Sequence, residues 1–441
     1  MQQRLAQEFS FPELLRFAFP SIVMMVFVSL YTIVDGLFVS NFVGPEAVAA
    51  LNLVYPVQGV ALAIGIMFAT GGSALVAIRM GQGRNEEARS AFTLILVTSV
   101  TLSLAVTVLT LTNLESLCRW LGAEGETLVY SEVYLGTLIC FIPVGAIQLF
   151  FQSFFVTAGR PKLGLVMNIG AGVFNIVFDY LLVVPGGMGV QGAALATGGG
   201  YCIPAIGGLI FFWRNRNGLC FRRPKWDGRL LLQTCANGSS EMVTNLSSSV
   251  TTLLLNFYTL RFAGTDGVAA ITAVFYCQFL MTSMFMGFSM GVSPVISYHY
   301  GAENRDYLRR TVRRCGTFVL LSSAAVWVIS LLGVTGIVSA FFRPGTAVFA
   351  MAVRGFRIFV TGFLGAGINI FASALFTAIG DGKNSALISF SRTLFFEVLA
   401  IVVLGYFFQM HGVWMAVPAA EFITVGLVGL CTIRLRRENL L

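Results

Sequence analysis

The chain has 441 residues, of which 56% are hydrophobic and only 11% are charged, and its formal net charge is +8. Soluble domains carry about 25% charged residues, so this composition excludes a soluble protein and predicts a polytopic membrane protein. The first apolar run, from about 17 to 42, is too long for the hydrophobic region of a cleavable signal peptide. The eight cysteines form no CxxC pair and no metal-ligand spacing, which indicates small core residues.

Apolar runs of about 20 residues are long enough to cross a bilayer as helices. Such runs predict about twelve helices, near 14–42, 47–79, 91–112, 129–157, 162–184, 190–213, 235–262, 267–299, 311–334, 351–378, 384–407 and 413–434. The predicted fold is an all-α integral membrane protein. Two of the runs, 47–79 and 267–299, exceed the bilayer thickness, so these helices should tilt, kink or protrude.

Basic residues in the loops orient the predicted helices. Alternate loops hold most of the Lys and Arg residues, above all the stretch RNRNGLCFRRPKWDGR at 214–229. Because positively charged loops remain in the cytoplasm, we expect both termini there, in a multi-pass protein of a bacterial-type inner membrane. The basic residues flank membrane segments and belong to no nucleic-acid-binding module, so we expect no nucleic acid partner.

The sequence repeats itself at a shift of 220 residues. FVGPEAVAAL at 42–51 returns as FAGTDGVAAI at 262–271, and GQGRNEEAR at 81–89 corresponds to GAENRDYLR at 301–309. Further on, TAGRPK at 157–162 matches TAIGDGK at 377–383, with Gly159 on Gly380. Each repeat holds six predicted helices, so both copies share one orientation and form two pseudo-symmetric six-helix bundles.

The repeat divides the chain into three parts. We predict an N-terminal lobe at 1–213, a cytoplasmic linker at 214–234 and a C-terminal lobe at 235–441. Two similar bundles around one axis along the membrane normal enclose a cavity, which favours a transporter over a channel or a membrane enzyme.

The sequence shows no recognisable enzymatic site. The two histidines, His299 and His411, lie near predicted helix ends and belong to no metal-spaced cluster. No P-loop pattern GxxxxGK[ST] occurs, so ATP is not the energy source. GQGRNEEAR lies between two predicted membrane helices and is repeated at 301–309, which indicates a structural turn rather than a phosphate-binding loop. We therefore expect a protein that is not an enzyme and that has no cofactor.

Polar residues inside the predicted helices mark a candidate site. A charged residue at a helix centre costs about 2.5–3.5 kcal/mol on insertion scales, so its presence points to function. Asp35, Asp179 and Thr197 lie about five to seven residues from the outer ends of their helices, roughly 8–11 Å below the interface. Asn175 shares the helix face of Asp179. Together they predict a cation or proton site, although each aspartate could instead bond a neighbouring backbone or hydroxyl group.

Several motifs agree with one known family. They are Pro20 and VDGLFVSNFVG in the first helix, an Asn-x-x-x-Asp pattern at Asn175 and Asp179, GVQGAALAT in the sixth helix, NGSSEMVTNLSSSV at 237–250, and Pro294. Along nearly its whole length the chain resembles the multidrug and toxic compound extrusion (MATE) transporters. The resemblance implies a V-shaped, twelve-helix antiporter that exports organic cations in exchange for protons or sodium ions. It also implies that Asp35 and Asp179 belong to the coupling site of the N-terminal lobe.

The C-terminal lobe departs from the family pattern. Some relatives place a glutamate centrally in helix 7 and an aspartate in helix 10, where this chain has Glu241 near the helix start and Asn369. The internal repeat agrees, because Asp35 shifted by 220 falls beside Asn256. Glu397 is the central acid of this lobe. It is either a second ion or substrate carboxylate, in a site with Asn256 and Asn369, or a structural partner for an arginine.

Two further charged residues lie in the last predicted helices. Arg392 is offset from Glu397 by five residues, about 140° around a helix, so the two are poorly placed to pair on that helix. Glu421 is expected to pack between helices through hydrogen bonds.

Two other transporter classes share parts of this plan. A lipid-linked saccharide flippase or another exporter of the same superfamily would have this architecture, but it should carry cationic residues in its cavity to bind phosphate. A major facilitator transporter would also have two six-helix halves, but GQGRNEEAR lacks the Asp-Arg pair typical of its loop. We therefore expect a monomeric antiporter in the lipid bilayer that binds a small organic cation and H⁺ or Na⁺. Apart from a sodium ion at Asp35 and Asp179, we expect no metal.

Overall fold

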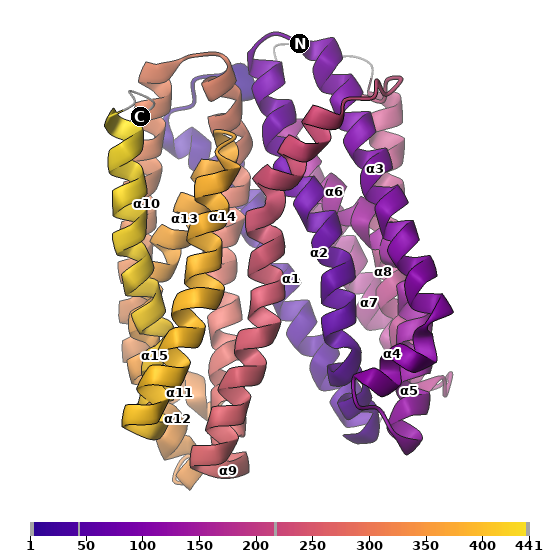
Figure 1. Cartoon of the computed structure of the whole chain (residues 1–441), viewed down its shortest axis with the longest axis vertical. Coiled ribbons are helices and arrows are strands. Elements are labelled where there is room, and N and C mark those ends of the chain that lie inside the picture. Colours follow the sequence, from indigo (N-terminus) through magenta and orange to yellow (C-terminus); the bar gives the residue numbers. More distant parts are fainter. Residues whose placement is uncertain (1–3, 43–44, 216–217, 438–441) are drawn as a thin grey trace.

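The computed structural model describes residues 4–42, 45–215 and 218–437, although the side chains of 33–37, 39–41, 45, 48–49 and 434–437 lie outside this description. Every regular element in these residues is a helix, and no strand occurs among them. The predicted all-α class is therefore confirmed. The two marked chain ends lie at one end of the molecule, which is termed the terminus side below (Figure 1).

The first lobe runs from η1 to α8. Its elements are η1 (Arg4–Ala6), α1 (Phe11–Phe42), α2 (Pro45–Gly81), α3 (Asn85–Thr112), α4 (Leu114–Trp120), α5 (Gly125–Ile139), α6 (Ile142–Thr157), α7 (Pro161–Val183) and α8 (Gly189–Arg214). The single helix predicted over 129–157 is divided into α5 and α6, which meet at 51°. Pro143 lies in the first turn of α6, where a proline breaks no intrahelical hydrogen bond. It therefore fits the start of a new helix after the bend.

The second lobe runs from α9 to α15. Its elements are α9 (Gly228–Gly301), α10 (Arg305–Leu332), α11 (Val334–Ser339), α12 (Ala347–Phe359), η2 (Val360–Gly362), α13 (Phe363–Ala378), α14 (Gly382–Phe390), η3 (Ser391–Phe395) and α15 (Phe396–Arg437). Oδ1 of Asp227 accepts a hydrogen bond from the backbone N–H of Leu230 at 3.0 Å and caps α9. Because α9 begins at Gly228, residues 228–234 of the predicted linker are helical.

These helices supply twelve membrane crossings. Among the described residues, nine stretches are long and apolar enough to cross a membrane, and the bent α5–α6 pair makes ten. A straight α9 of 74 residues would be about 110 Å long, far more than the roughly 30 Å of a bilayer core. It breaks at Gly264 (φ 64°, ψ −159°), and α15 breaks at Gln409 (φ 50°, ψ −128°). The stretches Gly228–Gly301 and Gly382–Ile433 therefore each cross twice, which confirms the predicted number of helices.

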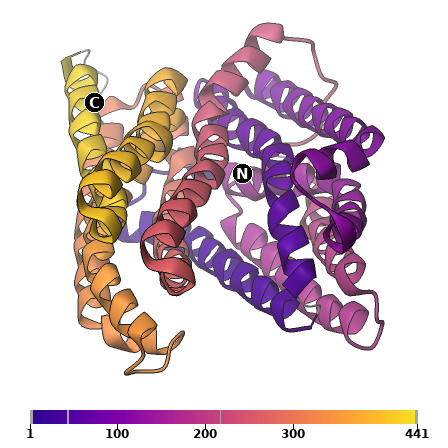
Figure 2. The same cartoon turned by 60° about the horizontal axis from the view of Figure 1, so that its bottom comes forward.

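The helices form two bundles that lie side by side. Indigo to magenta segments gather on one side in Figure 1, orange to yellow segments gather on the other, and Figure 2 shows the same division. α1 and α2 of the first lobe pack against α9 of the second. This arrangement is the V-shaped, two-lobed plan that the family resemblance implied.

Two repeat-related glycines bring the lobes together at the terminus side. A Cβ on Gly81, at the end of α2, would collide with the carbonyl oxygen of Tyr298 in α9. A Cβ on Gly301 would collide in the same way with the carbonyl oxygen of Ile78. Both partners follow the 220-residue repeat, so the contact has the symmetry of the sequence. Backbone packs against backbone here, and the lobes are closed at this end.

Aromatic side chains fill the first lobe between α3, α6 and α8. The rings of Phe150 and Phe154 stack with centroids 4.1 Å apart, and Phe92 lies 5.0 Å from Phe154 and 4.8 Å from Phe212. All four side chains are fully buried. Stacked and tilted rings of this kind stabilise a core beyond the area they bury. The cluster therefore fixes the end of α6 relative to the end of α8.

Candidate functional site

α7 carries two buried polar side chains on one face. Asp179 is 1% exposed and Asn175 is 4% exposed, although both lie in a helix that can cross the membrane. They are four residues apart, which places one above the other along the helix. Both side chains therefore face protein rather than lipid, as a carboxylate in a membrane helix requires.

Thr197 of α8 lies against this face. Nδ2 of Asn175 donates a hydrogen bond to Oγ1 of Thr197 at 3.3 Å. The two helices approach closely because Gly200 has no side chain, and a Cβ on it would lie 3.6 Å from Cβ of Asn175. Oδ1 of Asn175 is buried and has no hydrogen-bond partner among the described residues. This oxygen is a hydrogen-bond acceptor that lies one helical turn from the carboxylate of Asp179.

α1 packs directly against α7. A Cβ on Gly172 of α7 would lie 2.5 Å from Cε1 of Phe27 and 3.1 Å from Cδ1 of Tyr31, so both rings of α1 cover this glycine. Asp35 also belongs to α1, but its side chain lies outside the described residues. The structure thus brings Asn175 and Thr197 together, whereas the joint site of Asp35 and Asp179 stays a prediction.

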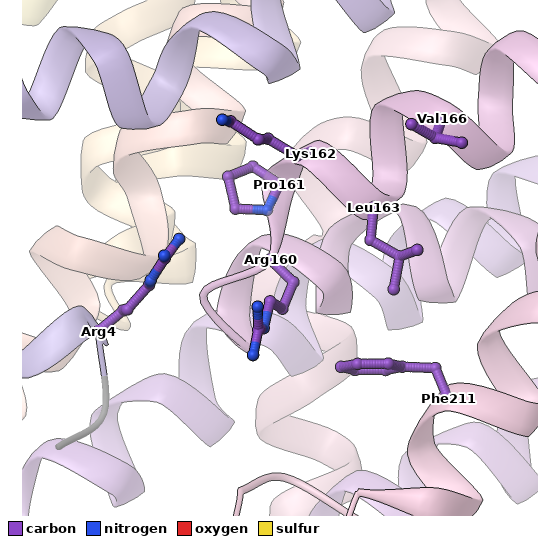
Figure 3. Close-up of a pocket in the computed structure, with 7 residues that line it drawn as sticks. All are labelled: Arg4, Arg160, Pro161, Lys162, Leu163, Val166 and Phe211. Atoms are coloured by element: carbon purple, nitrogen blue, oxygen red, sulfur yellow. The ribbon is translucent and has the colours of Figure 1, made fainter. Parts of the chain in front are cut away.

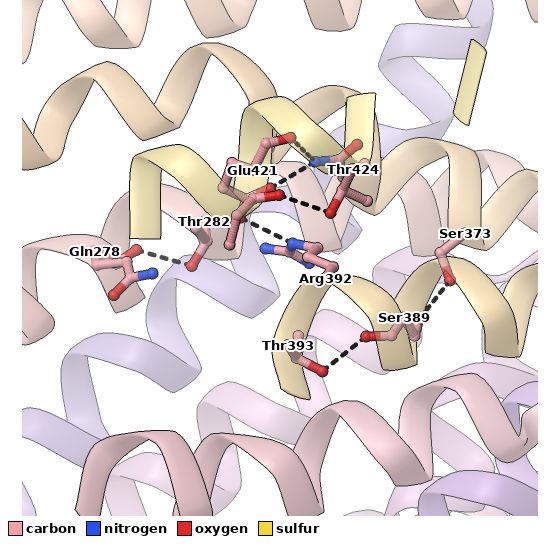
Figure 4. Close-up of polar contacts among 10 residues, drawn as sticks. Gln278, Thr282, Ser373, Ser389, Arg392, Thr393, Glu421 and Thr424 are labelled. Carbon is pink, nitrogen blue, oxygen red and sulfur yellow. Dashed lines mark hydrogen bonds and ion pairs between the residues drawn. The ribbon is translucent and has the colours of Figure 1, made fainter. Parts of the chain in front are cut away.

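The second lobe contains a buried ion pair. Nε of Arg392 lies 2.8 Å from Oε1 of Glu421, and the two side chains are 13% and 4% exposed. Asn369 of α13 donates from Nδ2 to Oε2 of Glu421 at 2.6 Å and to its backbone oxygen at 2.9 Å. Figure 4 shows Arg392 and Glu421 facing each other between their helices. Glu421 therefore bonds between helices as predicted, and Arg392 offsets its charge.

The ion pair itself was not predicted, because Arg392 lies in the π-helical turn η3. A π turn inserts a residue into the helix and shifts the direction of the following side chains, so a regular periodicity of 3.6 residues does not carry through it. The pair could have been predicted from the chemistry of the two residues. An arginine and a glutamate that are each isolated in an apolar helix are tolerated in a membrane when they pair.

The remaining residues of the predicted second-lobe site are not joined by hydrogen bonds in the described part of the chain. Glu397 is half-buried and lies within electrostatic range of Arg392 and Glu421. As predicted, no ion pair joins it to Arg392 within that part. Asn369 bonds Glu421 instead. Oδ1 of Asn256 in α9 is buried without a hydrogen-bond partner among the described residues.

A chain of buried hydroxyl groups links α9, α13 and α14 beside the ion pair. Oγ of Ser373 lies 2.9 Å from Oγ of Ser389 and 3.0 Å from Oγ of Ser385 (Figure 4 shows the first contact). Oγ1 of Thr377 continues the chain, 2.8 Å from Ser385 and 3.4 Å from Oγ of Ser240. Hydroxyl bonds between helices hold membrane bundles together. These bonds therefore hold the helix that carries Arg392 against its neighbours.

The two lobes have the same helical plan but different polar centres. In the first lobe, Asp179 and Asn175 are buried on one face of α7, and the amide of Asn175 donates to the hydroxyl of Thr197. In the second, Arg392 offsets Glu421 and the half-buried Glu397 lies beside the pair. Within the described residues, no group of three or more His, Cys, Asp or Glu side chains could hold a metal ion.

The sequence profile of the MatE family matches residues 20–181 and again residues 242–403. The two matches cover most of the chain and fall one in each lobe. The chain belongs to the MatE family. Because MatE proteins are transporters, this protein is a multi-pass membrane transporter and not an enzyme. The resemblance seen in the sequence motifs is thereby confirmed.

Relatives of this MatE chain include two staphylococcal proteins named Multidrug export protein MepA. The one from Staphylococcus haemolyticus is 23% identical over 418 residues, covering 94% of this chain and 91% of the relative. The one from Staphylococcus aureus strain NCTC 8325 is 20% identical over 437 residues, covering 98% of this chain and 95% of the relative. The similarity therefore spans almost the full length of all three proteins.

Solved MATE structures share the fold of this chain. A crystal structure of MATE in complex with MaL6 matches with a TM-score of 0.91 and 22% identity, covering 97% of this chain and 96% of that one. An outward-facing conformation of a multidrug resistance MATE family transporter of the MOP superfamily matches with a TM-score of 0.89 and 23% identity, with the same coverage. At this identity the matches establish the fold, and the twelve-helix prediction is confirmed.

Proposed function

We propose that this transporter exports organic cations, including drugs, across a bacterial inner membrane in exchange for H⁺ or Na⁺. The family and the two relatives named as multidrug export proteins support such substrates. The observation that carries the coupling is the buried face of α7, where Asp179 and Asn175 lie next to Thr197. We assign these three residues and Asp35 to the ion-coupling site of the first lobe.

A buried carboxylate couples two cations because its charge can be neutralised by either of them. Asp179 takes up the ion when the site opens to the outside, and an organic cation displaces the ion when the site opens to the inside. Each elementary charge that moves inward gains about 2.3 kcal/mol per 100 mV. A one-for-one exchange of monovalent cations is electrically neutral, so the ion concentration gradient alone drives it. With Asp35 as a second carboxylate, two ions can enter for each organic cation, and the membrane potential then contributes.

The same oxygen atoms suit either ion. Hard cations bind to oxygen ligands, and the carboxylate of Asp179, the Oδ1 of Asn175 and the Oγ1 of Thr197 supply them. A proton needs only the carboxylate. Transport under a pH gradient and under a sodium gradient therefore distinguishes H⁺ from Na⁺ as the coupling ion.

We propose a secondary role for the second lobe. Glu397 is half-buried and therefore accessible, unlike Glu421, whose charge Arg392 offsets. With Asn256 and Asn369 on neighbouring helices, Glu397 supplies a further carboxylate for the ion or the substrate. A lipid-linked saccharide flippase is less well supported, because Arg392, which could otherwise bind a phosphate, already binds Glu421.

We also propose that the terminus side is cytoplasmic and that the protein acts as a monomer. The loops on this side hold most of the Lys and Arg residues, and positively charged loops remain in the cytoplasm. Both lobes come from one chain. No second copy is needed to build the transport path.

Transport by reconstituted protein tests this function. Proteoliposomes that contain the protein and ethidium are given first a pH gradient and then a sodium gradient, and ethidium movement is followed by fluorescence. We expect one of the two gradients to drive transport, and Asp179→Asn to abolish it. Asp266→Asn is the matched control because Asp266 is exposed near the break at Gly264. Wild-type protein that responds to neither gradient would refute the proposed antiport.

A further inference from the structure

A cavity of about 400 Å³ lies on the first lobe, where α6 turns into α7. Three cationic side chains line one part of it and three apolar side chains line the other: Arg4, Arg160 and Lys162, and Leu163, Val166 and Phe211. Figure 3 shows Arg4 and Arg160 approaching the space from two different segments. The ion-coupling site lies further along α7, so this cavity is separate from it.

The cationic part of the cavity has no acidic partner. Arg4, Arg160 and Lys162 are exposed, and none of them forms an ion pair with any described residue. α7 begins at Pro161 without an acidic residue in its first turn, and the N-terminal end of a helix adds partial positive charge. An anion is therefore the complementary ligand.

The apolar part of the cavity belongs to membrane-spanning helices. Val166 of α7 is 62% exposed, and Phe211 of α8 packs edge-on against Phe155 with ring centroids 5.8 Å apart. The contact with Phe155 holds the Phe211 ring in place at the cavity wall. A ligand that uses both parts must carry an anionic group at the membrane surface and an apolar chain along the helices. Free phosphate has the first feature but lacks the second.

We propose that this cavity binds an anionic phospholipid from the leaflet on the terminus side. The phosphate lies among Arg4, Arg160 and Lys162, and an acyl chain runs along Val166 and Phe211. Guanidinium groups bind phosphate oxygens through paired hydrogen bonds. Basic pockets between membrane helices recognise such headgroups by the same combination of charge and depth.

The internal repeat shows that the second lobe lacks this cavity chemistry. Gly159, Arg160 and Lys162 correspond to Gly380, Asp381 and Lys383. Asp381 is an acid, and its Oδ1 accepts a hydrogen bond from the backbone N–H of Asn384 at 3.2 Å to cap α14. An acid at this position repels a phosphate, so we expect no lipid site in the second lobe. Lys383 is therefore the matched control for Lys162.

Every residue that lines the cavity belongs to the first lobe, but one wall of it is attached to the second lobe. Arg4 packs on the turn at Gly159 of the first lobe. The segment that follows Arg4 is attached to the second lobe, because the backbone N–H of Phe9 donates to Oη of Tyr307 at 3.0 Å and Nδ2 of Asn304 donates to Glu8 at 2.7 Å. A lipid that holds Arg4 against the α6–α7 turn therefore links the lobes through this segment and stabilises the arrangement closed at the terminus side. This consequence for transport rests on the proposed function, whereas the binding does not.

Lipid binding to the purified full-length protein in detergent tests the proposal. Dioleoylphosphatidylglycerol, dioleoylphosphatidylcholine and inorganic phosphate are titrated separately, and bound lipid is counted by native mass spectrometry alongside thermal unfolding. We expect phosphatidylglycerol to bind and stabilise the protein, and the other two to have little effect. Arg160→Gln and Lys162→Gln should each weaken binding about fivefold, from the contribution of one cation at a membrane surface. Lys383→Gln should bind as wild type does.

Three results would overturn the site. They are equal binding of phosphatidylcholine, an equal loss in Lys383→Gln, and stabilisation by inorganic phosphate as large as that by phosphatidylglycerol. Arg4→Gln tests the bridge, because it should weaken lipid binding although Arg4 lies outside the α6–α7 turn. Unchanged lipid binding in that variant would restrict the site to the α6–α7 turn and refute the link through Arg4 to the second lobe. These readouts need no transport, so they stand even if neither ion gradient drives ethidium movement.

Discussion

Asp179 and Glu421 illustrate two ways in which a membrane helix accommodates a carboxylate. Glu421 is bonded to Arg392 and Asn369, so its charge is offset and its oxygens are occupied. Asp179 lies on a face shared with Asn175, whose Oδ1 has no hydrogen-bond partner in the described part of the chain. The first arrangement suits a structural role, whereas the second leaves the buried Oδ1 of Asn175 for a mobile cation.

Neutralising carboxylates of the first and the second lobe should therefore have unequal effects on the rate of export. We predict that Asp179→Asn abolishes gradient-driven export and that Asp35→Asn does the same, while Glu397→Gln lowers the rate only partly. Glu397 lies beside an existing ion pair, and the neighbouring carboxylate, Glu421, is already bonded to Arg392. Initial efflux rates at matched expression measure this order. A larger loss in Glu397→Gln than in Asp179→Asn would move the coupling site to the second lobe.

The buried ion pair gives a prediction about stability. Arg392→Gln should destabilise the protein by about 3–5 kcal/mol, because it leaves the charge of Glu421 buried without a partner. The double variant Arg392→Gln/Glu421→Gln should recover most of this loss, since it removes both charges. Thermal unfolding in detergent measures the change, with the exposed Arg309→Gln as control. A double variant as unstable as the single one would show that the charges do not act as a pair.

At the scale of helices, glycines decide how closely α2 and α9 approach. Gly81 and Gly301 occupy equivalent places in the two repeats, and neither has room for a methyl group. Overlap with backbone atoms cannot be relieved by rotating a side chain. Any larger residue must therefore push the two helices apart.

We predict that Gly81→Ala and Gly301→Ala each open the terminus side and slow export. Spin labels at positions 87 and 309, one on α3 and one on α10, should show a shift to longer distances in pulsed electron paramagnetic resonance. Gly316→Ala in α10 is the control, because a Cβ there meets nothing within 4 Å. A distance distribution in Gly81→Ala identical to that of the wild type would show that the glycine contact does not hold the lobes together.

Helix positions could be predicted from the sequence, while local breaks in the helices could not. The apolar runs are long, so α3, α7 and α8 lie close to their predicted ranges. Hydropathy is averaged over many residues and does not register the bend between α5 and α6 or the π turn at Ser391–Phe395. The ion pair of Arg392 and Glu421 depends on that turn and on a contact 29 residues away. The polar face of α7 was predictable because Asn175 and Asp179 are four residues apart in a regular helix.

At the scale of the whole molecule, two related six-helix lobes differ in chemistry. The family profile matches both lobes, and the glycine contacts between them follow the same 220-residue symmetry. The symmetry fails at the polar centres: the first lobe has a carboxylate with neighbouring amide and hydroxyl oxygens, and the second has an ion pair. One lobe is thus specialised for ion coupling in our proposal.

The central claim is that Asp179 holds the coupling ion. Difference infrared spectroscopy of the carboxyl stretching region, recorded as the reconstituted protein is acidified with and without Na⁺, tests it most directly. We predict a wild-type band that changes with acidification or with Na⁺, that is retained in Glu397→Gln, and that is lost in Asp179→Asn. A spectrum of Asp179→Asn that keeps the whole wild-type response would contradict the claim, because the ion would then bind to another carboxylate.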